Sequence, residues 1–275
     1  MLNQISTVSS WNGEIVYDPL EIEFIRPPIY EVIRVVDGVP LFFVEHCERL
    51  YQSMTLLDME VPFTTEAIYD VINKMVAETQ IMNNNIRIEI GYDFEETLNW
   101  VAFWVKSIYP EAQVYAEGVK TVTYQAEREN PHAKVFRRDF IQTIQHLRDE
   151  TGAFEVILLK ANGQVTEGSR SNLFFVKGDT LISASESDVL QGITRKKLIE
   201  AVNKLSVKLV ERAIDQSEIE SFDACFLTGT SIHVLPIQAM DGKHFESSQH
   251  PLVNKLKALF EHIVQDDLKH TRGGI

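Results

Sequence analysis

Hydrophobic and polar residues alternate along short segments in the first part of the chain, a pattern typical of strands with one buried face. The alternation predicts strands at residues 14–17, 29–36, 40–44, 86–92 and 100–107. The turn dipeptide Asp37-Gly38 connects the second of these strands to the third. Helical spacing predicts two helices between the strands, at residues 45–57 and from the capping residue Thr64 to residue 79.

The second part of the chain begins after a polar stretch without periodicity at residues 109–118. Apolar runs then predict strands at residues 119–125, 156–160, 172–176, 207–210, 224–228 and 234–237. Helical spacing predicts helices at residues 139–150, 193–205, 216–221 and 251–265. The polar stretch is the candidate domain junction. We therefore expect a mixed α/β (α+β) protein with domains at residues 1–115 and 116–275.

Composition narrows the class of protein without naming its function. With 275 residues, 44% hydrophobic and 24% charged, the chain has the composition of an ordinary globular protein. A net charge of −14 disfavours binding to nucleic acid or to an anionic membrane. No apolar run is long enough to span a bilayer, and the first residues lack a signal-peptide pattern. Cys47 and Cys225 are too few for a disulfide framework or a zinc site, so we expect a cytoplasmic location and no metal.

The segment TEGSRSN, residues 166–172, is the first candidate for chemistry. It places Glu167 at an expected sharp turn between the strands at residues 156–160 and 172–176, after the turn dipeptide Asn162-Gly163. A carboxylate held in this way can keep a ring nitrogen protonated, which a pyridine-based cofactor demands of its protein. The alternative is a solvated glutamate on a hairpin.

Three further segments could bind an anion. The loop Leu190–Arg195 precedes a helix, whose first backbone N–H groups and dipole favour a phosphate. The loop Thr228–Ser231 follows a buried strand and offers a glycine and hydroxyl groups. Arg49 could make a bidentate contact. Each has a plain alternative: an ordinary turn, a loop hydroxyl and a solvated helix residue.

Taken in order, the motifs of this chain resemble those of the class IV, fold-type IV pyridoxal-phosphate enzymes over nearly its whole length. The matching segments are WNG (11–13), YEVIRVVDG (30–38), EHCERLYQS (45–53), a lysine in a loop before a helix, TEGSRSN (166–172), LQGITRKKLIE (190–200), FLTGTS (226–231) and LPIQAMDG (235–242). That family includes branched-chain and D-amino-acid aminotransferases and 4-amino-4-deoxychorismate lyase. The resemblance implies a small N-terminal α/β domain, a larger C-terminal pseudo-barrel domain that binds pyridoxal 5′-phosphate (PLP), and a homodimer.

The resemblance also implies roles for individual residues. Lys134 would be the Schiff-base lysine, and Glu167 would pair with the pyridine nitrogen. The 5′-phosphate would be held by Arg49, by Thr230 and, through backbone N–H groups, by Ile193 and Thr194. Gly229 and Ser231 would offer backbone N–H groups to the cofactor or to a substrate carboxylate.

Several candidates on the substrate side have alternatives. Tyr30 lies where the family often places a tyrosine near the substrate, and packing on a core is the alternative. Arg128 would bind a substrate carboxylate or a neighbouring acid. Arg138 matches an arginine of the lyases, and with Arg137 it would either lower the pKa of Lys134 or be solvated.

Two segments depart from the family pattern. Arg26-Pro27-Pro28 stands where relatives carry a glycine-rich stretch, so we expect a reshaped substrate wall. Arg87 lies where D-amino-acid aminotransferases carry a carboxylate trap of arginine and histidine, but acidic residues follow it here. This argues against the usual D-amino-acid specificity. We expect Arg87 to face solvent, with contact to the site as the alternative.

The resemblance leads to an expected reaction. The chain would move an amino group between a small amino acid, branched-chain or otherwise apolar, and a 2-keto acid by a ping-pong Schiff-base mechanism. One alternative is a 4-amino-4-deoxychorismate lyase, which eliminates pyruvate with the same cofactor. The other is a PLP-binding protein without turnover.

Overall fold

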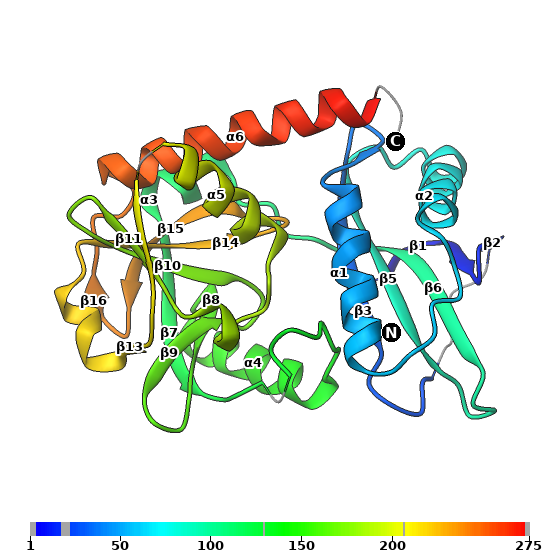
Figure 1. The fold of residues 1–275 in the computed structure, drawn as a ribbon, viewed down its shortest axis with the longest axis horizontal. Coiled ribbons are helices and arrows are strands. Elements are labelled where there is room, and N and C mark those ends of the chain that lie inside the picture. Colours follow the sequence, from blue (N-terminus) through cyan, green and yellow to red (C-terminus); the bar gives the residue numbers. More distant parts are fainter. Residues whose placement is uncertain (1–3, 18–22, 129, 206, 273–275) are drawn as a thin grey trace. The chain divides into compact units, whose positions relative to one another are not determined.

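The computed structural model describes residues 4–17, 23–128, 130–205 and 207–272. The contacts within the chain divide it into two compact units. Unit 1 consists of Met1–Ile108, Ala133–Arg138 and Val264–Ile275, and unit 2 of Tyr109–His132 and Asp139–Ile263. Both units combine helices with a sheet, so the mixed α/β prediction is confirmed (Figure 1).

Unit 1 is built on an antiparallel sheet of six strands in the order β2-β1-β6-β5-β3-β4. The strands are β1 (Gln4–Trp11), β2 (Glu14–Val16), β3 (Ile29–Val36), β4 (Val39–Pro40), β5 (Asn84–Tyr92) and β6 (Leu98–Val105). The helices α1 (Phe43–Leu56) and α2 (Thr65–Thr79) pack on one face of this sheet. Alternate residues of β3 and β5, with Trp104 of β6, form the core beneath the two helices.

The strand predicted at residues 40–44 is wrong. β4 ends at Pro40, and α1 begins at Phe43. Phe42 adopts a left-handed conformation with φ 50°, which stops the strand. Its N–H group donates to Asp267 Oδ2 at 2.7 Å, a partner far along the chain. Phe43 is buried in the core at the first position of α1, so the apolar run at residues 40–44 includes the start of a helix.

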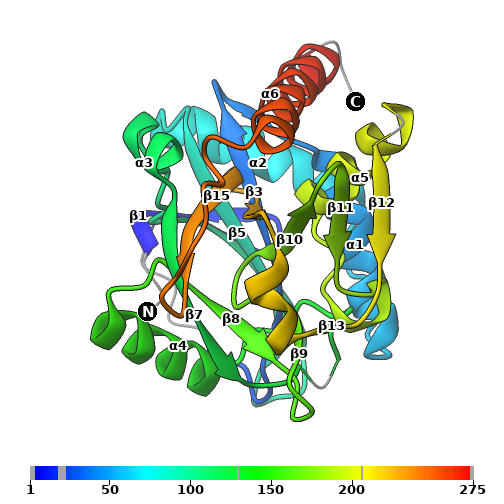
Figure 2. The same cartoon turned by 90° about the vertical axis from the view of Figure 1, so that its left-hand side faces the viewer.

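Unit 2 contains a mixed sheet of ten strands in the order β12-β11-β10-β14-β15-β7-β8-β9-β13, with β16 beside β15. The strands are β7 (Val119–Gln125), β8 (Glu155–Leu159), β9 (Gln164–Gly168), β10 (Asn172–Lys177), β11 (Thr180–Ser183), β12 (Lys208–Glu211), β13 (Ile214–Asp215), β14 (Ala224–Gly229), β15 (His233–Met240) and β16 (Lys243–His244). The helices are α3 (Ala112–Glu117), α4 (Arg138–Thr151), α5 (Ile193–Lys204) and α6 (Pro251–Arg272), with 3-10 turns η1 (Glu186–Asp188) and η2 (Gln216–Ser221). The part of α6 from Val264 onward belongs to unit 1. The strands curve around a common core to which eight of them contribute side chains (Figure 2).

The sequence pattern predicted that Glu167 lies in a sharp turn, and this prediction is wrong. Residues Gln164–Gly168 form β9, which pairs with β8 across the Asn162-Gly163 turn. β10 lies beside β11 and β14 instead. The local pattern could not reveal β9, because its other neighbour is the short β13, where Ile214 pairs with Val165.

The expected domains, residues 1–115 and 116–275, stay a prediction. The first segment of unit 1 ends at Ile108, and α3 forms in the stretch predicted to lack periodic structure. The segment Ala133–Arg138 belongs to unit 1 because it is bonded to β3. Tyr30 N–H donates to the carbonyl oxygen of Lys134 at 2.9 Å, and Phe136 N–H donates to that of Pro28 at 2.9 Å. In the described part of the chain, no helix combines the length and apolar character needed to cross a membrane.

We expect Leu50→Ala to destabilise unit 1 by about 2–5 kcal/mol, because Leu50 is 1% exposed in the core under α1. Leu56→Ala on the same helix is the matched control, since Leu56 is 56% exposed and its truncation removes little packing. Urea unfolding followed by tryptophan fluorescence measures the difference. All three tryptophans, Trp11, Trp100 and Trp104, lie in unit 1. Equal losses in the two variants would contradict this packing.

Candidate active site

Lys134 is held against β3 and α1 of unit 1. Its carbonyl oxygen accepts from Tyr30 N–H, and its own N–H donates to Ser53 Oγ at 3.3 Å. The Ser53 hydroxyl in turn donates to the carbonyl oxygen of Arg49, one turn earlier on α1, at 3.0 Å. Lys134 Nζ lies 5.0 Å from the centroid of the Tyr30 ring. The structure thus brings three predicted site residues, Lys134, Tyr30 and Arg49, to one region of unit 1.

Arg49 is not a solvated helix residue. It is 5% exposed, and its Nε and Nη2 groups donate to the two carboxylate oxygens of Glu31, each at 2.7 Å. Glu31 lies on β3 and is completely buried, and its Oε2 also lies 2.8 Å from His46 Nδ1. The phosphate-binding role of Arg49 stays a prediction. What the geometry establishes is that β3 fixes the orientation of its guanidinium.

The cluster of Glu31, His46 and Arg49 shifts the pKa of two of its members. Burial raises the pKa of Glu31, but the charge of Arg49 and the hydrogen bonds from His46 and Arg49 outweigh it, and the pKa lies well below its usual range. Burial lowers the pKa of His46, against the opposing hydrogen bond and charge of Glu31. The charges of Arg49 and Lys134 lower it further. His46 is therefore neutral at pH 7 and donates its Nδ1–H to Glu31.

Of two expectations for the substrate-side arginines, the structure contradicts one and agrees with one alternative of the other. Arg87 is 8% exposed on β5, so the prediction that it faces solvent is wrong. Its Cζ lies 4.2 Å from the ring centroids of both Tyr30 and Phe136. Arg137 and Arg138 are exposed where α4 begins, which matches the solvated alternative. A role for Arg138 toward substrate stays a prediction.

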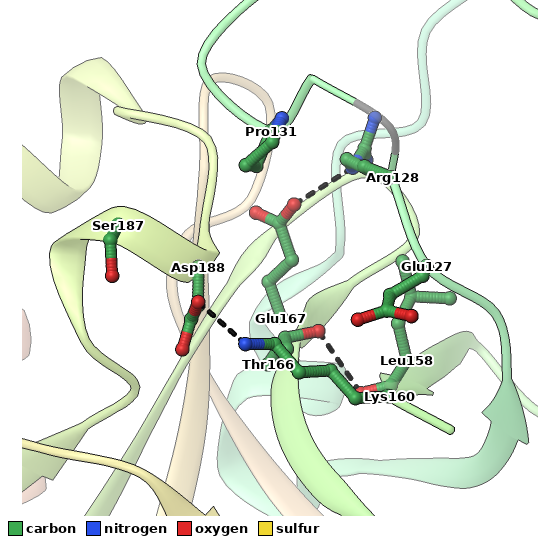
Figure 3. A pocket seen from close by; sticks show the side chains of 9 residues that line it. All are labelled: Glu127, Arg128, Pro131, Leu158, Lys160, Thr166, Glu167, Ser187 and Asp188. Atoms are coloured by element: carbon green, nitrogen blue, oxygen red, sulfur yellow. Dashed lines mark hydrogen bonds and ion pairs between the residues drawn. The ribbon is translucent and has the colours of Figure 1, made fainter. Parts of the chain in front are cut away.

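In unit 2, Glu167 is 2% exposed on β9, and three donors surround its carboxylate. Asn172 Nδ2 and Leu190 N–H donate to Oε2 at 3.0 and 3.1 Å. Arg128 Nε lies 2.8 Å from Oε1, and Arg128 Nη2 donates to the carbonyl oxygen of Ser169 at 2.8 Å (Figure 3). Arg128 therefore contacts a neighbouring acid, one of its two expected alternatives. A pocket of about 240 Å³ opens beside this ion pair.

Asn172 connects Glu167 to the helix that could bind an anion. Besides Glu167, its Nδ2 donates to the carbonyl oxygen of Leu190 at 2.9 Å. A Cβ at Gly192 would lie 2.0 Å from Asn172 Oδ1, so the close approach requires glycine there. α5 begins directly after Gly192, with no side-chain cap on its first N–H groups in the described structure. Ile193 and Thr194, both 4% exposed, occupy this first turn.

Asn172 also lies opposite the second candidate anion loop. In the β10–β14 ladder its register partner is Thr228. The Thr228 hydroxyl is buried and has no hydrogen-bond partner among the described residues. Gly229, Thr230 and Ser231 follow at the turn into β15, where they are half-buried. An unsatisfied buried hydroxyl beside a glycine turn is consistent with a ligand that carries acceptor oxygens.

Glu155 shapes the turn that follows Glu167, a role that the sequence analysis missed. It is 2% exposed at the start of β8. Its carboxylate accepts from the Ser169 and Ser171 hydroxyls at 2.5 and 3.0 Å and from Arg170 N–H at 3.3 Å. The signal in the sequence was an acidic residue opening an apolar strand, together with two serines in TEGSRSN. No group of His, Cys, Asp and Glu residues in the described ranges could hold a metal ion.

Comparison with known proteins completes the picture. The family model for amino-transferase class IV matches residues 28–240, most of the chain. The chain belongs to the class IV aminotransferase family. It is 26% identical over 254 residues to a branched-chain-amino-acid aminotransferase of Pseudomonas aeruginosa, covering 85% of this chain and 83% of that one. It is also 26% identical over 259 residues to a D-alanine aminotransferase of Listeria monocytogenes, covering 86% and 87%.

Solved structures of family members show the same fold. A branched-chain amino acid aminotransferase from Thermoproteus uzoniensis, solved with norvaline, matches with a TM-score of 0.82 at 22% identity, covering 94% of this chain and 95% of that one. A Legionella pneumophila protein assigned as a 4-amino-4-deoxychorismate lyase matches with a TM-score of 0.78 at 20% identity, covering 90% of this chain and 97% of that one. The predicted fold class is therefore confirmed.

We expect His46→Gln to flatten the pH dependence of the free energy of unfolding of unit 1 between about pH 7 and pH 5. Because the pKa of His46 is lowered on folding, the unfolded chain binds the extra proton first, and acid destabilises the wild type in this window. The measurement is urea unfolding by tryptophan fluorescence at several pH values. His262→Gln, at an exposed position of α6, is the control and should keep the wild-type slope. The same slope in all three proteins would refute the assignment.

Glu155→Ala should destabilise unit 2 by about 2–4 kcal/mol, since it leaves two buried hydroxyls and a backbone N–H without their acceptor. Amide hydrogen exchange should report faster exchange in β8 and β9, with β5 and β6 unchanged. Glu150→Ala, which removes an exposed carboxylate at the end of α4, is the matched control. Equal protection of β9 in both variants would mean that Glu155 does not hold this turn.

Proposed function

We propose that the protein is a PLP-dependent aminotransferase that moves the amino group of a small apolar amino acid, branched-chain substrates first, to a 2-keto acid. The observation that carries the proposal is the arrangement around Asn172 in unit 2. The Asn172 side-chain amide donates both to the buried carboxylate of Glu167 and to the carbonyl oxygen of Leu190, in the loop before the uncapped start of α5. Asn172 is also the strand-register partner of Thr228, whose buried hydroxyl has no hydrogen-bond partner among the described residues. A ring nitrogen and a phosphate are the two ends of PLP that these groups would recognise.

The residues present fit this cofactor. Thr228 Oγ1 needs an acceptor, and the first N–H groups of α5, at Ile193 and Thr194, favour a dianion. Arg49 and Thr230 would complete the phosphate site, with backbone N–H groups of Gly229 and Ser231 beside it. Glu167 would accept the N–H of the pyridine ring and so keep that nitrogen protonated.

When bound, PLP supplies an electron sink for the negative charge that develops at the substrate Cα. Lys134 would hold the cofactor covalently until substrate arrives. Its amine, once released, would accept the proton from the substrate Cα and later return it, as general base and acid. Tyr30, 5.0 Å from Lys134 Nζ at its ring centroid, would form a wall of the substrate site, with Arg128 and Arg138 as further candidates toward substrate. The homodimer and the cytoplasmic location expected from the sequence are part of this proposal.

A 4-amino-4-deoxychorismate lyase is the second candidate. Arg138 supports it, because it matches the arginine pattern of the lyases and is exposed at the first residue of α4. The lyase reaction uses the same lysine and the same glutamate. The two functions differ in whether a 2-keto acid acceptor is needed.

The test compares the wild type with Lys134→Ala after incubation with PLP. Borohydride reduction followed by peptide mass spectrometry should place the cofactor on Lys134 in the wild type only. Turnover of leucine with pyruvate, a 2-keto acid that has no second carboxylate, should fall by about 10²–10⁴-fold in the variant, because it loses the general base. Lys120→Ala, at an exposed position of β7, is the control and should keep both properties.

The outcomes separate the candidates. Conversion of bound PLP to its aminated form by leucine or valine supports the aminotransferase. Pyruvate release from aminodeoxychorismate without a keto acid identifies the lyase instead. A wild type that takes up no PLP would refute both.

A further inference from the structure

An ion pair lies on the sheet face of unit 1 that faces away from α1 and α2. Arg87 and Glu89 are two residues apart on β5, so their side chains share one face, while Ile86, Ile88 and Ile90 point into the helix-covered core. Arg87 Nε lies 2.6 Å from Glu89 Oε1. Each residue is 8% exposed, which is unusual for charged side chains and requires a compensating environment.

Two aromatic rings contact the guanidinium of Arg87. Its Cζ lies 4.2 Å from the ring centroids of both Tyr30 and Phe136. The two centroids are 5.8 Å apart and the ring planes are nearly perpendicular, so the rings cover adjacent sides of the guanidinium. The ring faces provide cation–π contact but no hydrogen-bond acceptors. Nη2 is buried without a hydrogen-bond partner in the described structure, and the contact of Nε with Glu89 lacks hydrogen-bond alignment. Arg87 therefore has unused donors, although its charge is neutralised.

This pair lies close to the amine that the proposed function uses. The ring of Tyr30, which stacks on Arg87, has its centroid 5.0 Å from Lys134 Nζ. Phe136, the other ring, is two residues from Lys134 in the same loop. All of these residues belong to unit 1. A substrate bound with its Cα beside Lys134 Nζ would thus have its side chain within reach of the pair.

We propose that Glu89 determines the side-chain specificity of this site by masking Arg87. A guanidinium with free donors is the standard partner for a second carboxylate, as in a dicarboxylic amino acid. Here an anionic side chain must displace Glu89 or meet its charge, since like charges at such distances disfavour binding. An apolar side chain meets only a neutral pair in contact with two aromatic rings. Phe103 and Val101, the register partners of Arg87 and Glu89 on β6, extend the same face with apolar groups.

The inference rests on the proposed aminotransferase function, and it concerns the residue that excludes acidic donors from that site. Glu89→Gln should convert the wall from neutral to cationic while keeping its size. The double variant Arg87→Gln/Glu89→Gln has no charge at the wall and no unpaired buried ion. It serves as the folded reference if the single variant is unstable.

The experiment measures binding of two non-reactive acids to PLP-loaded protein by calorimetry. Glutarate carries a second carboxylate, and 4-methylpentanoate carries an isopropyl group in its place. In Glu89→Gln, glutarate should bind about 10-fold more tightly than to the wild type, with 4-methylpentanoate changed by less than about 3-fold. The double variant should lose the gain. Glu150→Gln, an exposed change of equal charge, should behave as the wild type.

The ratio of kcat/KM for glutamate to that for leucine should rise by a similar factor in Glu89→Gln. An unchanged glutarate affinity and an unchanged ratio, in a preparation that turns over leucine, would overturn the role of Glu89 alone. A wild type that binds no PLP and turns over no amino acid would refute the proposed function instead. A gain that persists in the double variant would show that Arg87 is not the anion partner, which also overturns the inference.

Discussion

A carboxylate that leaves water must be given donors or a cation in its place, and this constraint organises the chain around its four buried glutamates in the described residues. Glu31 ties α1 to β3 through Arg49 and His46. Glu155 holds the turn between β9 and β10, and Glu167 joins β9 to the loop before α5. Glu89 pairs with Arg87 on β5. Glu155 and Glu167 therefore fix backbone through Arg170 and Leu190 N–H, whereas Glu31 and Glu89 orient arginine side chains.

Local patterns in the sequence were sufficient wherever local forces decide the structure. The alternation at residues 29–36 predicted β3 and the apolar run at residues 119–125 predicted β7, both with the bounds that the structure has, and the Thr64 cap predicted the start of α2. Periodicity failed where a distant partner decides. Asp267 accepts a hydrogen bond from Phe42 N–H at the start of α1, and β13 pairs with residues 164–168. The segment that carries Lys134 is hydrogen-bonded to the start of β3 and so belongs to unit 1. None of these partners is visible in a window of neighbouring residues.

The candidate site likewise consists of residues that the sequence predicted and residues that it did not. The ordered motifs, through family resemblance, pointed to Lys134, Glu167 and the two anion loops, since these segments carry distinctive residue types. The residues that position them carry no such mark. Glu31 precedes its partner Arg49 by 18 positions, and Asn172 reaches Leu190 across another 18. Arg87 was expected in solvent because a charged residue on a strand usually lies there, and only the rings of Tyr30 and Phe136 explain its burial.

These pairings have a consequence for how the chain would treat anions. Its net charge is −14, yet three arginines near predicted site residues, Arg49, Arg87 and Arg128, are each neutralised by a buried glutamate. A ligand carboxylate or phosphate that approaches any of them meets a pair and not an isolated cation. Binding then depends on fixed backbone N–H groups and hydroxyls as much as on charge, which favours a ligand whose shape matches those donors. Selectivity in such a site is set by geometry, and the glutamate partners decide which anions are admitted.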